Sequence, residues 1–417
     1  MKSWIVAGCA GVLVAACGPA EKVEVLEPPI LPPPAEVHER LMVLDSHLDT
    51  PANLSKPDFD IMADNPTKLG EVQVDLPKMQ RGGLDGGYWV IFTPQGPLTD
   101  AAYAAALDGA RVRSDEIHAM VAAHPDEFEL AYTADDVERI AASGKRVVLQ
   151  SIENSYPLGT DISLLEEFYD RGVRMVGAIH FMDNQFGDSA TDLTSTDAGG
   201  LTPLGEALIR EANRLGMVID GSHSADAAVE DMIALSTTPV ILTHTGVKAI
   251  YDHPRNIDDD LLRRIADQGG VIQINAYSGY LELLEVSPER TAALDALRKE
   301  FEGVDFVTAD PETRARAMAR RAEVNAEFPP PISSFETFMD HMLYALEVVG
   351  PDHVGMGADW DGGGGVAGME DVSFLPKVTE RLLAEGYTEE DLQKIWGGNL
   401  MRVLREAEAA KEPAPAP

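Results

Sequence analysis

Short apolar runs alternate with helical periods along most of this chain, and this alternation constrains the fold more than any other feature. Eight runs have the length and continuous apolar character of buried strands. They are Leu41–Leu44, Gly87–Phe92, Val147–Ile152, Arg174–Ile179, Met217–Asp220, Val240–Thr243, Val271–Asn275 and Val354–Gly357. The clearest amphipathic segments between them are Ala101–Ala122, Leu204–Leu215, Ala225–Leu235, Asp258–Asp267 and Phe335–Val349. Such alternation predicts a parallel sheet covered on both faces.

Eight strand–helix units fit a closed barrel better than an open sheet, so we predict an α/β fold of the (β/α)8 TIM-barrel type. The barrel domain is expected to occupy residues 37–405 of the 417. A long helical stretch, Pro288–Glu327, precedes the eighth strand. We interpret it as an insertion that forms a lid or an interface.

The first residues resemble a bacterial lipoprotein signal. Lys2 precedes an uncharged apolar stretch that is too short to span a membrane as a mature helix. The stretch ends in Val14-Ala15-Ala16-Cys17, which resembles the lipobox. We therefore predict a signal peptide over residues 1–16, a lipidated Cys17, a Pro-rich tether over residues 17–36 and a disordered tail over residues 406–417. Because Gly18 follows the cysteine, the periplasmic side of the outer membrane is the favoured location in the cell envelope.

The charge and cysteine content exclude several classes of function. The chain has 70 Asp and Glu against 33 Lys and Arg, a formal net charge of −37. Such a surface repels nucleic acid and anionic lipid, so the lipid anchor is the only membrane contact that we expect. The second cysteine, Cys9, lies within the predicted signal. Any metal must therefore be held by histidines and carboxylates.

Ionisable residues follow six of the eight predicted strands at the carboxyl end. They are His47 and Asp49 after the first strand, Glu153 after the third, His180 after the fourth, His223 after the fifth, His244 after the sixth and Asp359 after the eighth. In a (β/α)8 barrel these ends open on one face, where the active sites of this fold lie. A single histidine after a strand is more often a turn or packing residue, but six coincidences favour one shared site. The remaining histidines receive no role, and that of His253, beside Arg255, is left open.

These side chains suit a two-zinc site. His47 and Asp49 are two residues apart on an extended segment, so they point the same way and can hold one ion. His223 and His244 end adjacent strands and can hold a second, while the two oxygens of Glu153 can bridge the pair. Two zinc ions roughly 3.5–4 Å apart would share a hydroxide nucleophile and polarise a carbonyl.

Several longer motifs resemble the membrane dipeptidase (renal dipeptidase) family of zinc amidohydrolase-like barrels, from about Leu41 to Arg402. The matching segments are Asp45-Ser46-His47-Leu48-Asp49-Thr50, Ser151-Ile152-Glu153-Asn154, Gly199-Gly200-Leu201-Thr202-Pro203-Leu204-Gly205, Asn213-Arg214-Leu215-Gly216-Met217, Asp220-Gly221-Ser222-His223, Arg255-Asn256, Gly355-Met356-Gly357-Ala358-Asp359-Trp360-Asp361-Gly362 and Gly397-Gly398-Asn399-Leu400-Met401-Arg402. The resemblance implies hydrolysis of dipeptides, with tolerance of a D-residue at the C-terminal position. A homodimer is common in the family.

The resemblance also implies roles for individual residues. One zinc ion would be bound by His47, Asp49 and Glu153, and the other by Glu153, His223 and His244. His180 would contact the carbonyl oxygen of the substrate, Arg255 would hold its C-terminal carboxylate, and Asp359 would carry the proton to the leaving amine. Asn154 and Ser155 stand where many relatives have two glycines, which leaves the shape of the substrate pocket open.

Two alternatives remain at this point. The first is another binuclear amidohydrolase that acts on N-acyl amino acids or lactones, many of which bridge their metals with a carboxylated lysine. No lysine occupies the predicted strand ends here, which favours the dipeptidase. The second is a non-catalytic binding lipoprotein, which the loss of a metal ligand or of the proton shuttle would favour. Neither loss is observed in the sequence.

Overall fold

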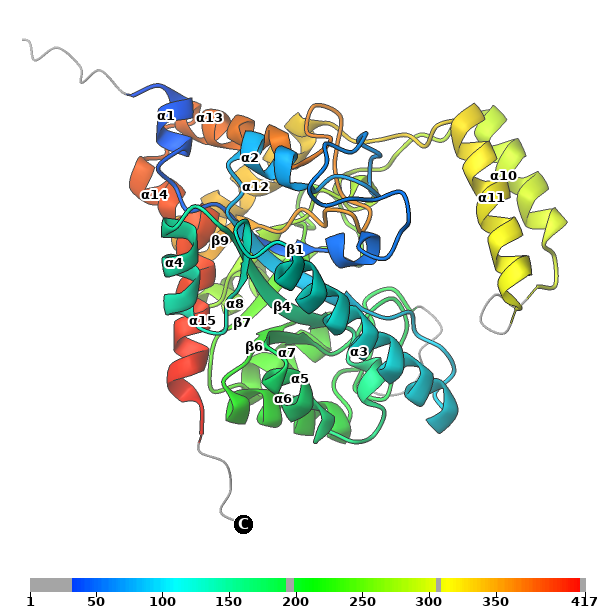
Figure 1. The fold of residues 1–417 in the computed structure, drawn as a ribbon, viewed down its shortest axis with the longest axis horizontal. Coiled ribbons are helices and arrows are strands. Elements are labelled where there is room, and N and C mark those ends of the chain that lie inside the picture. Colours follow the sequence, from blue (N-terminus) through cyan, green and yellow to red (C-terminus); the bar gives the residue numbers. More distant parts are fainter. Residues whose placement is uncertain (1–31, 193–198, 305–308, 413–417) are drawn as a thin grey trace, which may run out of the picture. The chain divides into compact units, whose positions relative to one another are not determined.

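The computed structural model describes residues 32–192, 199–304 and 309–412. Eight parallel strands follow one another in the order β1-β2-β4-β5-β6-β7-β8-β9, and a parallel bridge from Leu48 to Trp360 links the first strand to the segment after the last. The sheet is thus a nearly closed barrel, which confirms the predicted (β/α)8 fold (Figure 1). The strands are β1 (Leu44–Leu48), β2 (Gly86–Phe92), β4 (Arg146–Glu153), β5 (Val173–Gly177), β6 (Val218–Asp220), β7 (Val240–Thr245), β8 (Ile272–Ile274) and β9 (Val354–Met356).

Two strand predictions need correction. Strand β1 begins at Leu44, where the predicted strand Leu41–Leu44 ends, and it contains Asp45 and His47. These polar residues fit a buried strand because the carboxylate of Asp45 accepts hydrogen bonds from the backbone N–H groups of His47 and Ala358. The short strand β3 (Phe128–Leu130), which pairs with β4, was not predicted because three residues show no period.

The helices cover the outside of the barrel, and local sequence explains where several begin. The side chains of Thr202, Asp258 and Ser334 accept hydrogen bonds from backbone N–H groups in the first turns of α6, α8 and α12. The main helices are α1 (Pro34–His38), α2 (Leu76–Gly82), α3 (Asp100–Ala123), α4 (Ala134–Ala142), α5 (Leu164–Asp170), α6 (Pro203–Leu215), α7 (Asp226–Leu235), α8 (Asp259–Asp267), α9 (Ser278–Leu281), α12 (Phe335–Val349), α13 (Pro376–Ala384), α14 (Glu389–Gln393) and α15 (Asn399–Ala410).

Helix α15 packs on the barrel and corrects the predicted tail. Its side chains Leu400, Met401 and Leu404 belong to one buried cluster with residues from the barrel strands. The helix continues to Ala410, so residues 406–410 are helical rather than disordered. Alanine and glutamate are strong helix formers, and here Ala407 is buried in the cluster. Residues 413–417 lie outside the described residues.

The predicted signal peptide, the lipidated Cys17 and most of the tether also lie outside the described residues, so they stay predictions. Helix α1 begins at Pro34, within the last residues of the predicted tether. No helix in the described ranges combines the length and hydropathy needed to cross a membrane.

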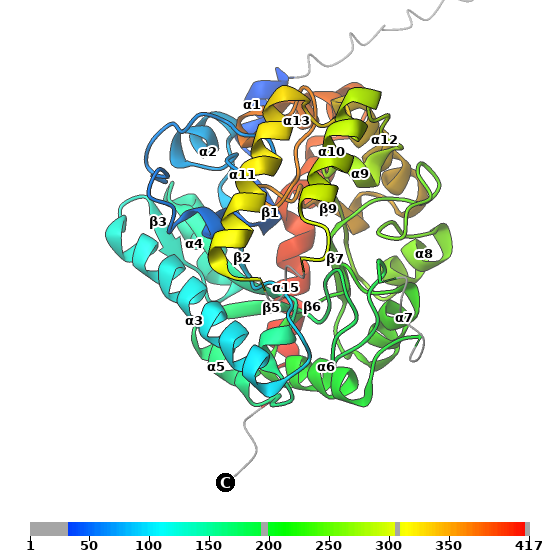
Figure 2. The ribbon, with the colours of Figure 1, turned by 90° about the vertical axis from the view of Figure 1, so that its right-hand side faces the viewer.

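The predicted insertion before the last strand is present as two helices. They are α10 (Pro288–Glu300) and α11 (Pro311–Glu327), which lie between β8 and β9 in the sequence. The pair stands apart from the barrel helices in Figure 1 and lies in front of the barrel in Figure 2, on the side opposite α15.

Candidate active site

The predicted metal and catalytic residues converge at the carboxyl ends of the strands. His47 lies within β1 and His244 within β7, while Glu153 is the last residue of β4. The others lie in the loops that directly follow strands: Asp49, His180, His223 and Asp359. Each of the seven side chains is buried or nearly so, and their interatomic distances show that they share one site.

The carboxylate of Glu153 lies at the centre of this site. Its Oε2 is 3.6 Å from Nε2 of His47. Its Oε1 is 3.0 Å from Nε2 of His223, 3.5 Å from Nε2 of His244 and 3.7 Å from Nε2 of His180. One carboxylate oxygen therefore faces the β1 side of the site and the other faces the remaining histidines, as a bridging ligand requires.

The donor atoms fit a metal centre. Nε2 of His47 is buried, lacks a hydrogen-bond partner among the described residues and lies 3.5 Å from Oδ2 of Asp49. Nε2 of His223 and Nε2 of His244 are 2.8 Å apart. Two neutral imidazole nitrogens cannot hydrogen-bond to each other through their lone pairs, whereas both can bind one cation. Three sets of ligand atoms lie close enough for an ion: His47, Glu153 and His244; Glu153, His180 and His223; and His47, Asp49 and Asp359.

A buried polar chain orients His244. Thr243 Oγ1 donates to Oδ2 of Asp220 at 2.6 Å and lies 2.8 Å from Nδ1 of His244. Since the hydroxyl proton is directed to the carboxylate, the hydroxyl oxygen accepts a hydrogen bond from Nδ1–H of His244. Nε2 of His244 therefore carries a lone pair, and this atom faces Glu153. A hydrogen bond on the outer ring nitrogen is typical of metal-binding histidines.

The electrostatics favour cation binding. Burial raises the pKa of Glu153, but the imidazoles of His47 and His180 oppose it and hold this pKa well below its usual range. Burial lowers the pKa of His223 and of His244 well below the usual value, and the charge of Arg255 acts in the same direction. The glutamate is therefore ionised and these two histidines are neutral at pH 7, which are the protonation states that bind metals.

Backbone strain concentrates at the same face. Four non-glycine residues among those described have positive φ: Asn154 at 65°, His223 at 67°, Asp359 at 64° and Asp361 at 67°. Each follows a barrel strand. Positive φ is costly for these residues, and such strain is found preferentially at functional sites.

Asp359 lies close to Asp49. A Cβ atom on Gly362 would collide with Oδ2 of Asp49 and Oδ1 of Asp359, so a larger residue at this position would have to displace these carboxylates. Burial, and next the negative charge of Asp49, raise the pKa of Asp359 well above its usual range. A carboxyl group that holds its proton more strongly than usual is suited to act as a general acid.

Arg255 supplies a buried positive charge. The residue is 3% exposed, its Nη2 donates to the backbone carbonyl of His244 at 3.1 Å, and its Nε has no partner among the described residues. The guanidinium carbon lies 5.3 Å from the centre of the Tyr280 ring. His253, whose role was left open, accepts a hydrogen bond from the backbone N–H of Arg255 at Nδ1. A buried guanidinium without a carboxylate partner suits an anionic group of a ligand.

A cavity of about 280 Å³ is lined by five of the site residues, namely Asp49, Glu153, His180, His223 and Asp359. Its lining adds side chains that the sequence did not single out, namely Ala52, Phe92, Phe181, Tyr277, Tyr280, Asp361 and Gly362. Asp361 was detectable, because it lies two residues after Asp359 in the same motif. Tyr277 and Tyr280 follow β8, a strand that precedes the insertion and whose end carries no ionisable residue. Only the packed structure shows that these tyrosines face the site.

The remaining histidines whose contacts are known have structural partners. His38 bonds to Thr379 and to the carbonyl of Gly82, and His341 bonds to the backbone of Val247 and Leu281.

The comparisons with known proteins agree with the geometry of the site. The sequence model of the family described as membrane dipeptidase (peptidase family M19) matches residues 34–417. Dipeptidase tcpJ of Claviceps purpurea is 31% identical, over 84% of this chain and 73% of its own length. Dipeptidase 3 of Mus musculus is 28% identical, over 89% of this chain and 65% of its own length.

Solved structures are also similar. The probable dipeptidase PvdM from Pseudomonas aeruginosa has a TM-score of 0.78 and 33% identity, over 90% of this chain and 98% of that one. A metallopeptidase from Rhodobacter sphaeroides, liganded with a phosphinate mimic of the dipeptide L-Ala-D-Ala, shares the fold with a TM-score of 0.69 at 23% identity, over 88% of this chain and 99% of that one.

Proposed function

This chain belongs to the membrane dipeptidase family, peptidase family M19, and on that premise we propose that it hydrolyses dipeptides at a site that holds two zinc ions. As a metallopeptidase of this family it carries its candidate ligands on β1, β4, β7 and the loop after β6. His47, Asp49 and Glu153 would bind one ion, and Glu153, His223 and His244 the other.

The position of Glu153 is the observation that supports the two-ion site best. Its two oxygens face different groups of ligand atoms at 3.0–3.6 Å, as one carboxylate shared by two cations would. Two zinc ions held by these residues would supply Lewis acidity and would lower the pKa of a water molecule for attack on the peptide carbonyl. Imidazole and carboxylate ligands without thiolates suit zinc in a hydrolytic site.

The residues around the metal ligands support a dipeptide as the substrate. Arg255 would pair with the free C-terminal carboxylate, because its guanidinium has no carboxylate partner among the described residues. His180 would contact the carbonyl oxygen of the scissile bond. Asp359 would carry a proton to the leaving amine, a role for which its raised pKa is suited. A cavity of about 280 Å³ suits a dipeptide better than a long chain.

The tolerance of a D-residue and the cell-envelope location belong to the same proposal. The phosphinate mimic of L-Ala-D-Ala bound by the Rhodobacter sphaeroides protein makes L-Ala-D-Ala a suitable first substrate. A lipid anchor on Cys17 would hold the enzyme at the membrane surface, and fractionation of cells that express Cys17→Ser tests that placement.

The direct test compares L-Ala-L-Ala, L-Ala-D-Ala and their C-terminal amides as substrates of zinc-loaded and chelator-treated protein. We expect hydrolysis of both free dipeptides, loss of activity on chelation, recovery with zinc, and two zinc ions per chain by metal analysis. Equal turnover of acids and amides would contradict the role of Arg255 and favour the broader amidohydrolase alternative. Fully active protein with one ion or none would contradict the two-ion site.

A further inference from the structure

The cavity of the site has two walls that lie on opposite sides of the barrel. In the strand order, β2 and β7 are separated by three strands in each direction around the barrel. Arg255 follows β7, and Tyr280, whose ring lies 5.3 Å from the guanidinium carbon, follows β8. Phe92 is the last residue of β2, and Ala52 lies in the short turn after β1. The lining therefore has Tyr280 near the arginine, and Phe92 and Ala52 across from it.

Phe92 lies next to the groups that are expected to act on the peptide bond. Its register partner on β4 is Glu153, so both side chains stand at the same level of the barrel and on the same face of the sheet. The centroid of the Phe92 ring lies 4.8 Å from that of the His180 ring. Phe92 and His180 both line the cavity, and Phe92 is only partly buried. An apolar surface thus borders directly on the position of the scissile carbonyl.

The three bonds of the scissile carbonyl carbon limit where the N-terminal residue of the dipeptide can lie. In the proposed function, on which this inference rests, the oxygen faces His180, the leaving nitrogen faces Asp359 and the C-terminal carboxylate pairs with Arg255. These groups follow β5, β9 and β7. The third substituent, the α-carbon of the N-terminal residue, is then directed to the remaining wall at β1 and β2. Phe92 and Ala52 are the apolar lining residues of that wall.

We propose that the N-terminal side chain of the dipeptide packs between Phe92 and Ala52, and that the enzyme prefers a branched apolar residue such as leucine at this position. Burial of apolar surface against a phenylalanine ring stabilises the bound dipeptide in proportion to the area removed from water. Ala52 is exposed and carries only a methyl group, so this side of the cavity leaves room for the branched side chain. An N-terminal glycine lacks the contact and should bind more weakly.

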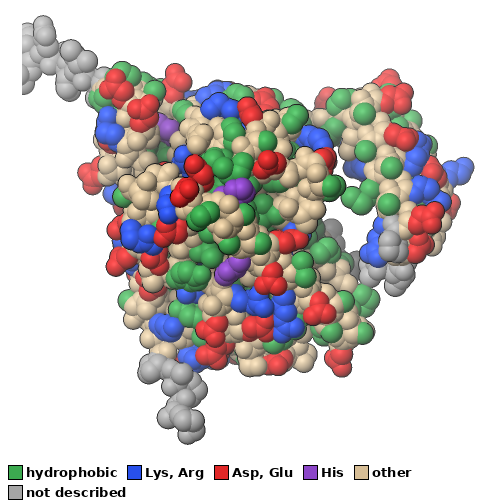
Figure 3. All heavy atoms as spheres, in the orientation of Figure 1, with side chains coloured by type: hydrophobic (Ala, Val, Ile, Leu, Met, Phe, Trp, Pro, Cys, Tyr) green, Lys and Arg blue, Asp and Glu red, His purple; other side chains and the backbone are tan. Residues whose placement is uncertain are grey.

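Charge adds a preference against acidic N-terminal residues. The described residues that line the cavity include the carboxylates of Asp49, Glu153, Asp359 and Asp361 but no lysine or arginine. An acidic side chain beside Phe92 would lose its hydration without gaining a basic partner on that wall. Acidic side chains are also spread over the molecular face in Figure 3, and the net charge of −37 opposes the approach of an anionic dipeptide.

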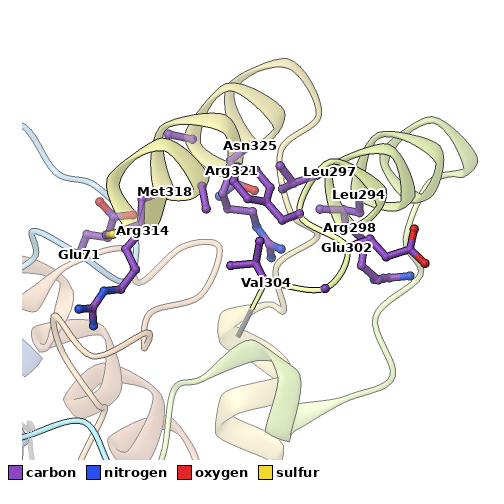
Figure 4. Close-up of a pocket in the computed structure, with 14 residues that line it drawn as sticks. Glu71, Leu294, Leu297, Arg298, Glu302, Val304, Arg314, Met318, Arg321 and Asn325 are labelled. Atoms are coloured by element: carbon purple, nitrogen blue, oxygen red, sulfur yellow. The ribbon is translucent and has the colours of Figure 1, made fainter. Parts of the chain in front are cut away.

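A second, larger cavity does not take part in this choice. A groove of about 850 Å³ lies between α10 and α11 (Figure 4). Its lining comes from these two helices, from their connection and from Glu71 before α2, and it includes Arg314 and Arg321. Among the described residues, none lines both this groove and the cavity of the site. The choice of the N-terminal residue therefore depends on the wall formed by Phe92 and Ala52.

Steady-state kinetics of the zinc-loaded full chain with Gly-Ala, Leu-Ala and Glu-Ala test the proposal. We expect kcat/KM for Leu-Ala to exceed that for Gly-Ala at least about tenfold, and Glu-Ala to be the poorest substrate. In Phe92→Ala the ratio of Leu-Ala to Gly-Ala should fall about tenfold. In Ala52→Leu it should also fall, because the added side chain occupies the space of the substrate's leucine. Met182→Ala is the matched control and should keep the ratio, because Met182 is 41% exposed and does not line the cavity.

A binding measurement separates this inference from the proposed function. Calorimetric titration with phosphinate mimics of Gly-Ala and Leu-Ala measures the preference without turnover, and the Leu-Ala mimic should bind more tightly. Equal kcat/KM and equal binding for glycine and leucine, or a ratio that neither Phe92→Ala nor Ala52→Leu changes, would overturn the proposal. Absence of hydrolysis of every dipeptide would contradict the proposed function. Tighter binding of the Leu-Ala mimic, lost in Phe92→Ala, would then still support the wall of Phe92 and Ala52.

Discussion

The two ends of the barrel are made from the same strands but differ in the hydrogen bonding of their polar groups. At the carboxyl ends, Nε2 of His47 and Nε of Arg255 have no hydrogen-bond partner among the described residues, and four non-glycine residues have positive φ. At the amino ends, Asn399 and His353 are paired: the amide of Asn399 donates to the carbonyls of Pro351 and Val354, and Nδ1 of His353 bonds to the carbonyl of Gly270.

This difference indicates that stability and chemistry are divided between the two ends. Unpaired donors and strained backbone cost free energy, and they persist where a ligand or metal later satisfies them. The amino end, covered by α15, contributes packing and hydrogen bonds. Substitutions at the carboxyl ends should therefore change activity and metal binding, whereas those at the amino ends should change stability.

The largest effect is expected for Asp359→Asn. Asparagine keeps the size of the side chain but cannot carry a proton, so kcat for L-Ala-D-Ala should fall by roughly 10²–10⁴. The thermal midpoint and the zinc content should change little, because asparagine keeps the size of the side chain and Asp359 is not one of the proposed zinc ligands. Steady-state kinetics, metal analysis and thermal unfolding measure all three. Asp352→Asn, an exposed carboxylate near the amino ends, is the control, and a kcat within about tenfold of the unmodified enzyme for Asp359→Asn would show that another group carries the proton.

Asp85→Asn, at the amino ends, should change the stability of the protein and leave its activity unchanged. Burial raises the pKa of Asp85 to about 6, against about 3.9 in an unfolded chain, although the carboxylate accepts a hydrogen bond from Val43 N–H. Between these pH values the folded state binds more protons than the unfolded state, so the free energy of unfolding falls as pH rises through this window. Asparagine keeps an acceptor for Val43 and cannot ionise, so the variant should lose this fall, which amounts to at most about 3 kcal/mol.

Denaturant unfolding at several pH values between roughly 4 and 7 measures the Asp85 effect as a difference in slope between the two proteins. The kcat at neutral pH should be unchanged. Parallel stability curves would mean that Asp85 titrates in the folded protein as it does in the unfolded chain, and a loss of kcat would weaken the division between the two ends.

A smaller effect is expected for Thr243→Val at the carboxyl ends. Valine has the shape of threonine but lacks the hydroxyl that connects Nδ1 of His244 to Asp220. Loss of such an outer hydrogen bond typically weakens metal affinity about 10–100-fold. Competition with a zinc chelator measures this without any substrate, and Thr243→Ser, which keeps the hydroxyl, should restore the affinity. Equal zinc affinity of the valine and serine variants would show that the hydroxyl does not orient the ligand.

Local sequence determined much of the fold and the identity of the ligands. Seven of the eight barrel strands lie where the apolar runs predicted them, because a strand that is buried on both faces must be continuously apolar. A histidine or carboxylate at the end of such a run was enough to predict that Glu153, His223 and His244 lie close together, since parallel strands align their carboxyl ends. The motifs at the strand ends also indicate the family.

Tertiary structure alone decided the features that depend on contacts between distant residues. Strand β1 includes Asp45 because N–H groups of His47 and Ala358, the latter far along the chain, satisfy its carboxylate. Tyr277 and Tyr280 line the cavity because of how the loop after β8 packs, which no periodicity encodes. Arg314 and Arg321 have no ion-pair partner among the described residues although the sequence is rich in carboxylates, because pairing is set by the distance between folded side chains and not by composition.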